Sequence, residues 1–238
     1  MSKVQAIILA GGKGARLRPY TTVLPKPLMP LGEFPIAEIV VRQLRRFGIT
    51  NITISTGHLA ELIEAFFGNG KRWGVKISYV RENIPLGTAG AVRLVNNLED
   101  DFLAINGDVL TDIHFGELLK FHKKKENIAT ITIKERKVVT DFGVIETSAR
   151  GELADYIEKP QHKSFVSTGM YILNKQCKEY IRPRESLGMP ELMLRMKNAG
   201  ETINCFKTNA LWLDLGRVDD FEAAQETFTK YQKRFLVE

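Results

Sequence analysis

Residues 9–19 read Leu9-Ala10-Gly11-Gly12-Lys13-Gly14-Ala15-Arg16-Leu17-Arg18-Pro19, and residues 24–28 read Leu24-Pro25-Lys26-Pro27-Leu28. A bend of small residues thus follows directly on an apolar, strand-like segment, and two cations, Arg16 and Lys26, stand ten positions apart. Glycines let backbone amides approach a phosphate group closely, and fixed cations balance the charge of a polyphosphate. We therefore predict a nucleoside triphosphate site at the end of a buried strand.

Two commoner glycine-rich loops do not fit this stretch. A Walker loop needs GxxxxGK followed by Ser or Thr, which the chain lacks, and the dinucleotide fingerprint GxGxxG fails because Leu17 stands at its last glycine. The remaining alternative is a plain strand-to-loop turn without a ligand. The cations Arg16 and Lys26 and the prolines near them argue against that alternative.

Apolar strands alternate with amphipathic helices on the C-terminal side of this loop. We expect strands at 4–10, 51–55, 75–80, 102–105 and 128–133, and helices at 35–47, 59–67 and 88–96, with a further helix capped by Asp112. This alternation predicts a Rossmann-like α/β fold, with a mostly parallel mixed sheet and helices on both faces. Ligands bind such sheets at the carboxyl ends of the strands, where the glycine loop and Asp108 both fall.

The second half of the chain is less regular and predicts a small β-rich lobe. Strand-like segments at 143–147, 153–158 and 165–173 suggest a hairpin-rich insertion beside the main sheet. A helix at 189–198, a strand at 202–206 and a final helix at 218–235 follow. Because no linker or repeat interrupts the sequence, we expect one domain over residues 1–238, with a lobe that covers the substrate.

The charge of the chain mildly favours polyanionic ligands. It holds 34 Lys and Arg against 28 Asp and Glu, for a formal net charge of +6. The basic residues are scattered, and the tightest group, 123–125, ends an expected helix, where cations suit the helix dipole. No basic motif interleaved with aromatic residues stands out, so we expect no nucleic-acid partner. A nucleic-acid-binding module would instead show salt-sensitive affinity for RNA or DNA.

The cysteines and histidines indicate a reducing compartment and argue against a zinc site. Cys177 and Cys205 stand apart, as is typical of a reducing compartment, and the four histidines form no HxH or HExxH zinc pattern. The segment 4–10 is too short for a signal peptide, and no apolar run approaches the ~20 residues of a membrane helix. We expect a cytoplasmic protein without a membrane partner. The oligomeric state stays open, a homo-oligomer included.

At residues 11–30 the sequence resembles the sugar-1-phosphate nucleotidylyltransferases, whose signature is GGxGxRLxPxT followed by PKPLxP. The resemblance covers nearly the whole chain, through PLGTAG (85–90), NGD (106–108), FGV (142–144), EKP (158–160), TGMY (168–171) and WLDLG (212–216). It implies transfer of NMP from an NTP to a sugar 1-phosphate, with release of pyrophosphate. It also implies a nucleotide-binding half near residues 1–110 and a sugar-phosphate-binding half near residues 111–238.

The resemblance gives three cations a catalytic part. Arg16 and Lys26 would hold the triphosphate, and Lys159 would neutralise the attacking sugar phosphate, because two anions must otherwise meet unaided. By itself, Lys159 is equally typical of a surface lysine before a proline turn. The implied nucleotide-binding residues are Leu9, Ala10, Gly11, Gly12, Gly14, Glu82, Pro85, Gly87 and Thr88. The implied sugar-phosphate-binding residues are Asn106, Gly143, Glu158, Lys159, Thr168 and Gly169.

Two aspartates, Asp108 and Asp214, bracket this implied site, each near the carboxyl end of an expected strand. Mg²⁺ prefers a few carboxylates together with water and substrate phosphate oxygens. Asp214 lies in a mostly apolar stretch that would not bury a charge without a partner. We therefore expect the two side chains to hold Mg²⁺ with the nucleotide; the alternative for either is a helix cap or a turn.

Glu82 favours GTP as the donor. Guanine offers adjacent N–H donors that one carboxylate can accept, whereas uracil and thymine offer a single imide donor between two carbonyls. Glu82, the PLGTAG segment and Gly11-Gly12 also resemble the mannose-1-phosphate guanylyltransferases. A surface glutamate beside a loop is the alternative. UTP or dTTP as donor and a non-catalytic, regulatory nucleotide-sugar-binding paralogue stay open as well.

Three departures from the full-length guanylyltransferases leave the sugar open. The sequence given ends after the helix that follows Asp214 and holds no hexapeptide-repeat domain; it reads Gly-Met-Pro-Glu-Leu at 188–192, where many relatives have an Ile-Glu segment. It also has Thr168 where the mannose enzymes often have Asn. A mannose or heptose 1-phosphate is expected, with N-acetylmuramate 1-phosphate open.

Overall fold

The apolar segment near the N-terminus forms the inner strand of a sheet. The computed structural model describes residues 4–125, 127–216 and 218–236. Strand β1 (Gln5–Ala10) pairs in parallel with β4 (Asn51–Thr56) on one side and with β6 (Asp101–Asn106) on the other. It is buried almost throughout, because helices cover both faces of the sheet, and its sequence is therefore a continuous apolar run.

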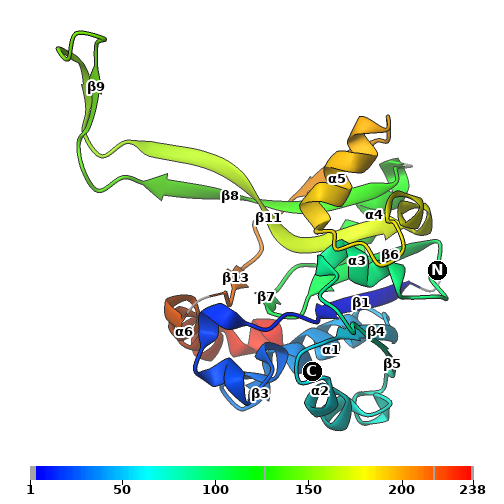
Figure 1. The fold of residues 1–238 in the computed structure, drawn as a ribbon. Coiled ribbons are helices and arrows are strands. Elements are labelled where there is room, and N and C mark those ends of the chain that lie inside the picture. Colours follow the sequence, from blue (N-terminus) through cyan, green and yellow to red (C-terminus); the bar gives the residue numbers. More distant parts are fainter. Residues whose placement is uncertain (1–3, 126, 217, 237–238) are drawn as a thin grey trace.

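The central sheet has seven strands in the order β12-β8-β11-β6-β1-β4-β5 (Figure 1). Neighbouring strands are parallel, except that β11 runs antiparallel to both β6 and β8. The expected mostly parallel α/β sheet is therefore confirmed. The strands not yet given are β5 (Lys76–Arg81), β8 (Ala129–Val139), β11 (Gln161–Asn174) and β12 (Ile203–Lys207).

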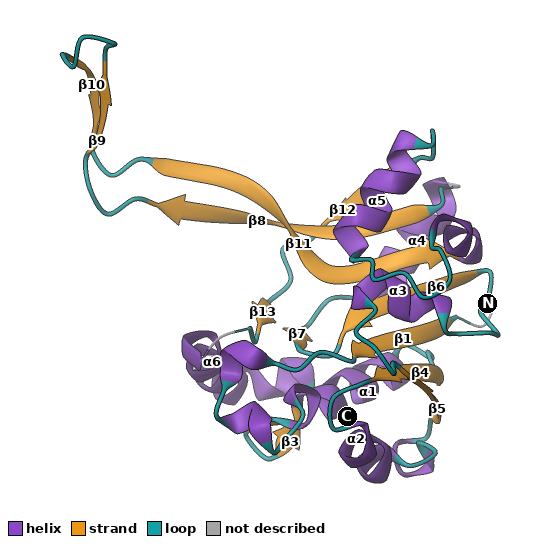
Figure 2. Ribbon diagram, viewed as in Figure 1, coloured by secondary structure: helices purple, strands orange, loops and turns teal. Residues whose placement is uncertain are grey.

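Helices pack on both faces of the sheet (Figure 2). Alternate side chains of β1 divide between the two layers, with Ile8 in one core cluster and Ile7 in the other. The layer on the Ile8 side is formed by α1 (Ile36–Arg46), α2 (Ala60–Phe67) and α4 (Phe115–Lys125). The layer on the Ile7 side is formed by α3 (Gly87–Arg93) and α5 (Met189–Asn198).

A third core cluster joins the C-terminal helix to the loop after β1. Phe228 and Phe235 of α6 (Val218–Phe235) are buried with Leu17 and Met29 from that loop. Short elements fill this region and the surface turns: β2 (Pro30–Leu31), β3 (Phe34–Pro35), β7 (Val109–Thr111) and β13 (Trp212–Asp214), and the 3-10 turns η1 (Ala15–Leu17), η2 (Tyr20–Thr22), η3 (Lys26–Leu28), η4 (Lys71–Trp73) and η5 (Lys175–Tyr180). The glycine loop is thus supported by chain from the opposite end of the sequence.

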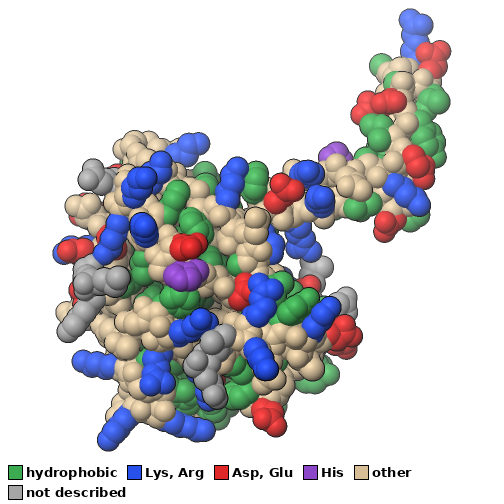
Figure 3. Space-filling model, turned by 180° about the vertical axis from the view of Figure 1, so that it is seen from behind, with side chains coloured by type: hydrophobic (Ala, Val, Ile, Leu, Met, Phe, Trp, Pro, Cys, Tyr) green, Lys and Arg blue, Asp and Glu red, His purple; other side chains and the backbone are tan. Residues whose placement is uncertain are grey.

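An arm projects from this body. Beyond the central sheet, β8 and β11 continue as a two-stranded ribbon, paired from Lys134–Val166 out to Val139–Gln161, and the hairpin of β9 (Val144–Thr147) and β10 (Leu153–Ile157) forms its tip (Figures 1 and 2). We call residues 134–166 the arm. Hydrophobic side chains are exposed along it (Figure 3). Eight of the thirteen exposed large hydrophobic side chains among the described residues lie there.

The expected hairpin-rich insertion beside the main sheet is corrected by this arrangement. The inner halves of β8 and β11 are members of the central sheet itself, since residues 168–173 of β11 are buried. Only their outer halves and the tip leave the body. The outer residues are exposed and give no burial pattern, which is why the sequence predicts shorter strands than those observed.

Among the residues described, no helix combines the length and the apolar character needed to cross a membrane.

Candidate functional site

The glycine loop leaves the carboxyl end of β1 in a conformation that requires small residues. Gly14 has φ of 60°, in the left-handed region, and its carbonyl accepts a hydrogen bond of 2.9 Å from the Thr21 hydroxyl. A Cβ added at Gly14 would lie 2.9 Å from the Thr21 methyl carbon. The loop therefore turns back on itself and brings Arg16 and Lys26 to the same end of the sheet.

A cleft of about 380 Å³ opens above this loop. All nine predicted nucleotide-binding residues line it, and so do Arg16, Lys26, Asn106 and Asp108. Its size suits a small-molecule ligand. The predicted residues are thus gathered in space, and their contact with a nucleotide stays a prediction. The helix expected at 88–96 begins one residue earlier, so Thr88 lies within α3 and does not cap it. The Thr88 hydroxyl instead accepts a 2.8 Å hydrogen bond from the Met189 amide at the start of α5.

Lys26 and Asp108 form an ion pair on the floor of this cleft. Both side chains are largely buried, with 10% of Lys26 and 24% of Asp108 exposed. Lys26 comes from η3 and Asp108 follows β6, so the tertiary fold joins two motifs that lie far apart in the sequence. A partly buried charge pair of this kind is costly to break on one side, because the other charge then stays buried alone.

Asp214 reaches the same place through a short antiparallel ladder. This ladder pairs β13 with β7 and places Asp214 opposite Val109. Next to it, the Leu215 amide donates a hydrogen bond to the Asp108 carbonyl at 3.3 Å. Burial and then the charge of Asp108 raise the pKa of the Asp214 carboxyl, while Lys26 and Arg16 oppose the rise. A Cβ built on Gly216 would lie 3.4 Å from Arg16 Nη1 and 3.5 Å from Asp214 Oδ1. Four of the predicted charged residues therefore converge.

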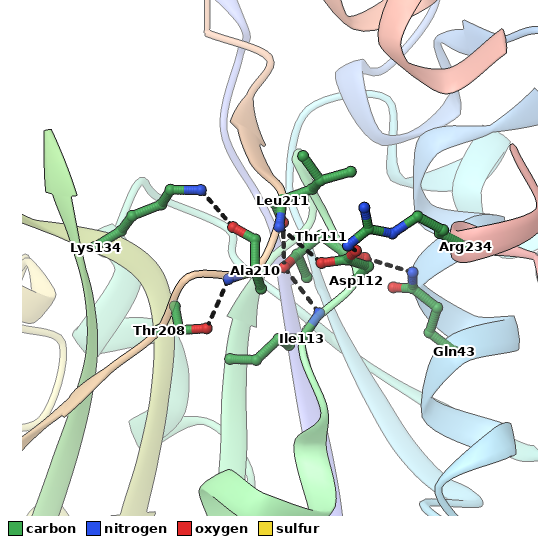
Figure 4. A network of polar contacts seen from close by, with 9 residues as sticks. All are labelled: Gln43, Thr111, Asp112, Ile113, Lys134, Thr208, Ala210, Leu211 and Arg234. Carbon is green, nitrogen blue, oxygen red and sulfur yellow. Dashed lines mark hydrogen bonds and ion pairs between the residues drawn. The ribbon is translucent and has the colours of Figure 1, made fainter. Parts of the chain in front are cut away.

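A polar network fixes the segment that leads into β13 (Figure 4). Asp112 accepts a 2.7 Å hydrogen bond from the Leu211 amide and pairs with Arg234 of α6, while the Thr111 hydroxyl donates to the Leu211 carbonyl at 2.8 Å. From the arm, Lys134 donates to the Ala210 carbonyl. The network positions Asp214 from three sides. Asp112, expected as a helix cap, serves here instead, because α4 begins three residues later at Phe115.

Glu82 stands at the far end of the cleft with a fixed carboxylate. Its Oε1 accepts from the Ser55 hydroxyl at 2.9 Å, and its Oε2 accepts from the Leu86 amide at 3.0 Å. It also lies against Gly11, where an added Cβ would come within 2.1 Å of Oε1. The glycine at position 11 and the glutamate at position 82 are therefore sterically coupled, which the sequence alone does not reveal.

The predicted sugar-phosphate-binding residues fall into two groups: Asn106, Thr168 and Gly169 lie together in the body, and the other three lie on the arm. Only Asn106 lines a cleft, where its buried Oδ1 has no hydrogen-bond partner among the described residues. Gly169 lies against the Asn106 side chain, with φ of 74°. Thr168 is fully buried; its hydroxyl donates to the Thr132 carbonyl at 3.0 Å, and its own carbonyl accepts from Trp212 Nε1 at 2.9 Å.

Gly143, Glu158 and Lys159 lie on the arm, where it bends into the tip hairpin. Glu158 and Lys159 are exposed, and none of the three lines the cleft described above. The expected convergence of five charged groups is therefore corrected to four, with Lys159 held apart. The physical reason is the unbroken pairing of β8 with β11 from residue 134 to residue 139, which carries the EKP segment away from the body.

The donor set fits a hard divalent cation held jointly with a phosphate ligand. Asp108 and Asp214 supply carboxylate oxygens, the ligand type that Mg²⁺ prefers. Among the described residues, no group of three or more His, Cys, Asp or Glu side chains is placed to hold a metal ion. A cation bound here would therefore have Asp108 and Asp214 as its protein ligands, and its remaining ligands would come from water and substrate, which is the usual form of a magnesium site.

Comparison with known proteins agrees with this geometry. Residues 5–231 match the family model described as nucleotidyl transferase. The chain belongs to that family. It is 34% identical to the mannose-1-phosphate guanyltransferase of Yarrowia lipolytica and 32% identical to the UTP–glucose-1-phosphate uridylyltransferase of Synechocystis sp., in each case over 92% of this chain. The chain spans 62% and 61% of the length of these two relatives.

Solved structures share the fold of this chain. A Bacillus anthracis protein described as a glucose-1-phosphate thymidylyltransferase superposes with a TM-score of 0.77 at 26% identity, over 98% of both chains. HddC from Yersinia pseudotuberculosis superposes with a TM-score of 0.74 at 24% identity, over 94% of this chain and 99% of its own. These relatives bear names with different nucleotides, and the family membership of the chain therefore leaves the base open.

Sequence reasoning missed the residues that line a second cleft, under the base of the arm. They include Lys134 and Arg136 of β8. A signal for them exists, because residues two apart in a strand share one face. This pattern was overlooked because the strand was expected to end at residue 133, whereas β8 extends to Val139.

Proposed function

We propose that the protein transfers NMP from an NTP to a sugar 1-phosphate and releases pyrophosphate. One observation carries the proposal: Arg16, Lys26 and Asp108 line the cleft of the glycine loop, and Asp214 lies close enough for its charge to interact with all three. Cations beside paired carboxylates are what a reacting polyphosphate and its metal ion require. Family membership and the relatives' names support the same class of reaction.

The reaction is a direct in-line displacement without a covalent enzyme intermediate. A phosphate oxygen of the sugar 1-phosphate attacks the α-phosphorus, and the bond from that phosphorus to the bridging oxygen of pyrophosphate breaks. Arg16 and Lys26 hold the triphosphate and stabilise the charge that develops on pyrophosphate. Asp108 and Asp214 would hold Mg²⁺, which when bound neutralises phosphate charge. Catalysis of this kind consists mainly of positioning and electrostatic stabilisation.

Lys26 also has to exchange partners during binding. In the structure its ammonium group is paired with Asp108. In the proposed complex the triphosphate takes over Lys26, and the Asp108 carboxylate becomes free for the cation. The pair therefore keeps two charges satisfied in the largely buried floor of the cleft until substrate arrives.

Lys159 is proposed as a further cation for the acceptor phosphate. The EKP motif supports this role, and the exposed position of Lys159 leaves its ammonium group accessible. Since Lys159 lies on the arm, its participation requires the arm to approach a cleft, either in its own chain or in a second copy.

Among donors we favour GTP, with mannose or heptose 1-phosphate as the acceptor. Support comes from Glu82, whose two oxygens are oriented by Ser55 and Leu86 at the end of the cleft and retain lone pairs for the adjacent N–H donors of guanine. UTP and dTTP are the second candidates, because the relative named for uridylyl transfer is 32% identical, against 34% for the one named for guanylyl transfer, and a solved structure named for thymidylyl transfer is 26% identical.

A grid of GTP, UTP, dTTP and ATP against mannose, heptose, glucose and N-acetylmuramate 1-phosphates tests the proposal. Phosphate released after pyrophosphatase treatment is measured in the presence of Mg²⁺. We expect GTP to give the highest kcat/KM and the Glu82→Gln variant to lower it selectively for GTP. A preference for UTP or dTTP would overturn the use of Glu82. No turnover with any pair would overturn the proposed reaction and favour a non-catalytic paralogue.

A further inference from the structure

A second cleft, of about 610 Å³, opens between the underside of the arm base, β13 and α6. Its lining combines charged side chains with an apolar patch: Arg16, Lys134, Glu135, Arg136, Val166, Trp212, Leu213, Asp214, Asp220 and Ala223. Its volume falls within the range of about 300–1,000 Å³ that is usual for small-molecule sites. None of the predicted acceptor-binding residues lines this cleft.

The second cleft adjoins the nucleotide cleft. Arg16 lines both of them, and Asp214 in the second lies close enough to Asp108 in the first for their charges to interact. A ligand in the second cleft would therefore lie beside Arg16 and Asp214, which the proposed function places near the reacting phosphate. An in-line reaction needs the attacking group to approach from a separate subsite of this kind.

Of the three cations that line this cleft, Arg16 is proposed to hold the triphosphate, which leaves Lys134 and Arg136 for a second ligand. Lys134 is engaged with the Ala210 carbonyl (Figure 4), and Glu135 pairs with Lys163 across the ribbon at 3.8 Å. The Arg136 side chain has no hydrogen-bond or ion-pair partner within the described part of the chain. A guanidinium group offers a planar fork of donors that matches a phosphate group.

The rest of the lining suits a sugar. Trp212, Leu213 and Val166 offer apolar surface for the face of a pyranose ring, and the carboxylates of Asp220 and Glu135 can accept hydrogen bonds from hydroxyl groups. Trp212 is held in place, because its Nε1 donates to the Thr168 carbonyl at 2.9 Å. The cleft thus pairs a phosphate-binding group with sugar-binding surface.

We propose that the second cleft is the acceptor subsite and that Arg136 contacts the phosphate of a hexose or heptose 1-phosphate bound there. This inference rests on the proposed function and names the residue that the sequence did not supply. Arg136 belongs to the base of the arm, which is paired to the body, and it can therefore act without any movement of the tip that carries Lys159.

Arg136→Ala, Arg136→Lys and the matched control Lys137→Ala test the proposal. Lys137 is the next residue of β8, is exposed, and lines neither cleft. For Arg136→Ala we expect the KM for the sugar 1-phosphate to rise about 10-fold or more, as for loss of one charge-assisted contact, with the KM for the NTP unchanged. Arg136→Lys should recover part of this loss, and Lys137→Ala should stay within about twofold of the wild type.

Equal KM values for the acceptor in Arg136→Ala and Lys137→Ala would overturn the proposal. Isothermal titration of mannose 1-phosphate and glucose 1-phosphate into the wild type and Arg136→Ala separates this failure from failure of the proposed function. If the wild type turns over no substrate pair but binds a sugar phosphate more tightly than Arg136→Ala does, the proposed subsite is supported and the proposed reaction is refuted. If binding is the same in both proteins, the subsite is refuted.

Discussion

The body and the arm of this molecule differ in how far their strands are covered by other elements. In the body, β1 is covered on both faces by helices, and Lys26 and Asp108 form a largely buried ion pair beside the more exposed Arg16 and Asp214. The arm is a two-stranded ribbon with no layer on either face, and Phe142, exposed by 78%, shows how little covers it. A two-stranded ribbon by itself is only marginally stable. The nucleotide side of the site is therefore preformed, whereas the EKP segment is not held against it.

The two regions are therefore proposed to serve different substrates. The residues proposed to bind the donor lie on strand ends and on loops anchored by buried side chains. Lys159, proposed to meet the acceptor, sits at the outer end of the ribbon, and Arg136 sits at its base. Substitutions in the two regions should therefore have different kinetic signatures.

The largest effect is expected from the body. Lys26→Ala and Asp108→Asn should each lower kcat by about 10²- to 10³-fold, because each removes a preorganised charge from the reacting phosphate. Pyrophosphate release measures the rate, and a melting curve of each variant checks that the protein is folded. Lys13→Ala, in the same loop but exposed and outside the cleft, is the control and should keep near-normal turnover. Normal rates in both active-site variants would contradict the assignment.

The next largest effect is expected on the arm. Lys159→Ala should lower turnover by roughly 10²-fold with the KM for the NTP unchanged, because the donor side is complete without it. Mixing Lys26→Ala chains with Lys159→Ala chains then tests whether Lys159 acts on its own chain or on a second copy. Recovered activity would place Lys159 in the cleft of a second copy, and no recovery would place it in its own. A Lys159→Ala variant with full activity would leave Arg136 as the acceptor cation.

A smaller effect is expected at the junction of the glycine loop and the base site. Gly11→Ala places a Cβ within 2.1 Å of Glu82 Oε1, so the carboxylate has to move. We expect the KM for GTP to rise about 10-fold, as for loss of one oriented contact, and the preference for GTP over UTP to shrink. The matched control is Gly11→Ala in the Glu82→Ala background, where the carboxylate that the Cβ would displace is absent. If Gly11→Ala raised the KM for GTP equally in both backgrounds, the proposed coupling would be wrong.

The smallest effect concerns stability and separates a buried histidine of the body from an exposed one on the arm. Burial lowers the pKa of His122, whose Nδ1 lies 2.9 Å from the Thr130 hydroxyl, although Asp101 partly opposes this shift. The unfolded chain therefore takes up the proton first, and the free energy of unfolding falls as the pH drops below about 6.5. Chemical denaturation at pH 5.5 and 7.5 should show a weaker pH dependence in His122→Gln, and an unchanged one in the arm variant His162→Gln.

The sequence predicted the body well, because its signals are local. The run from Leu9 to Lys26 fixed the glycine loop, the alternation of apolar segments predicted the parallel sheet, and the nine residues expected around a nucleotide do line one cleft. Turns at glycine, and the alternation of buried and exposed residues in strands and helices, can be recognised from residues close together in the sequence. The tip hairpin was predicted, as strands at 143–147 and 153–158, but the outer ribbon of β8 and β11 was not, because exposed strands carry no such period and nothing in the sequence marks where a ribbon leaves its sheet.

By itself, then, the sequence determined the chemistry of the groups: small residues for close phosphate approach, two cations, two aspartates and the family of the chain. Tertiary structure alone decided which of them meet. The β7–β13 ladder brings Asp214 to Asp108, the network around Asp112 holds it there, and Gly11 proves to be coupled to Glu82. The ribbon moves Lys159 away and presents Arg136 instead. Such choices depend on contacts between distant segments, which no local pattern encodes.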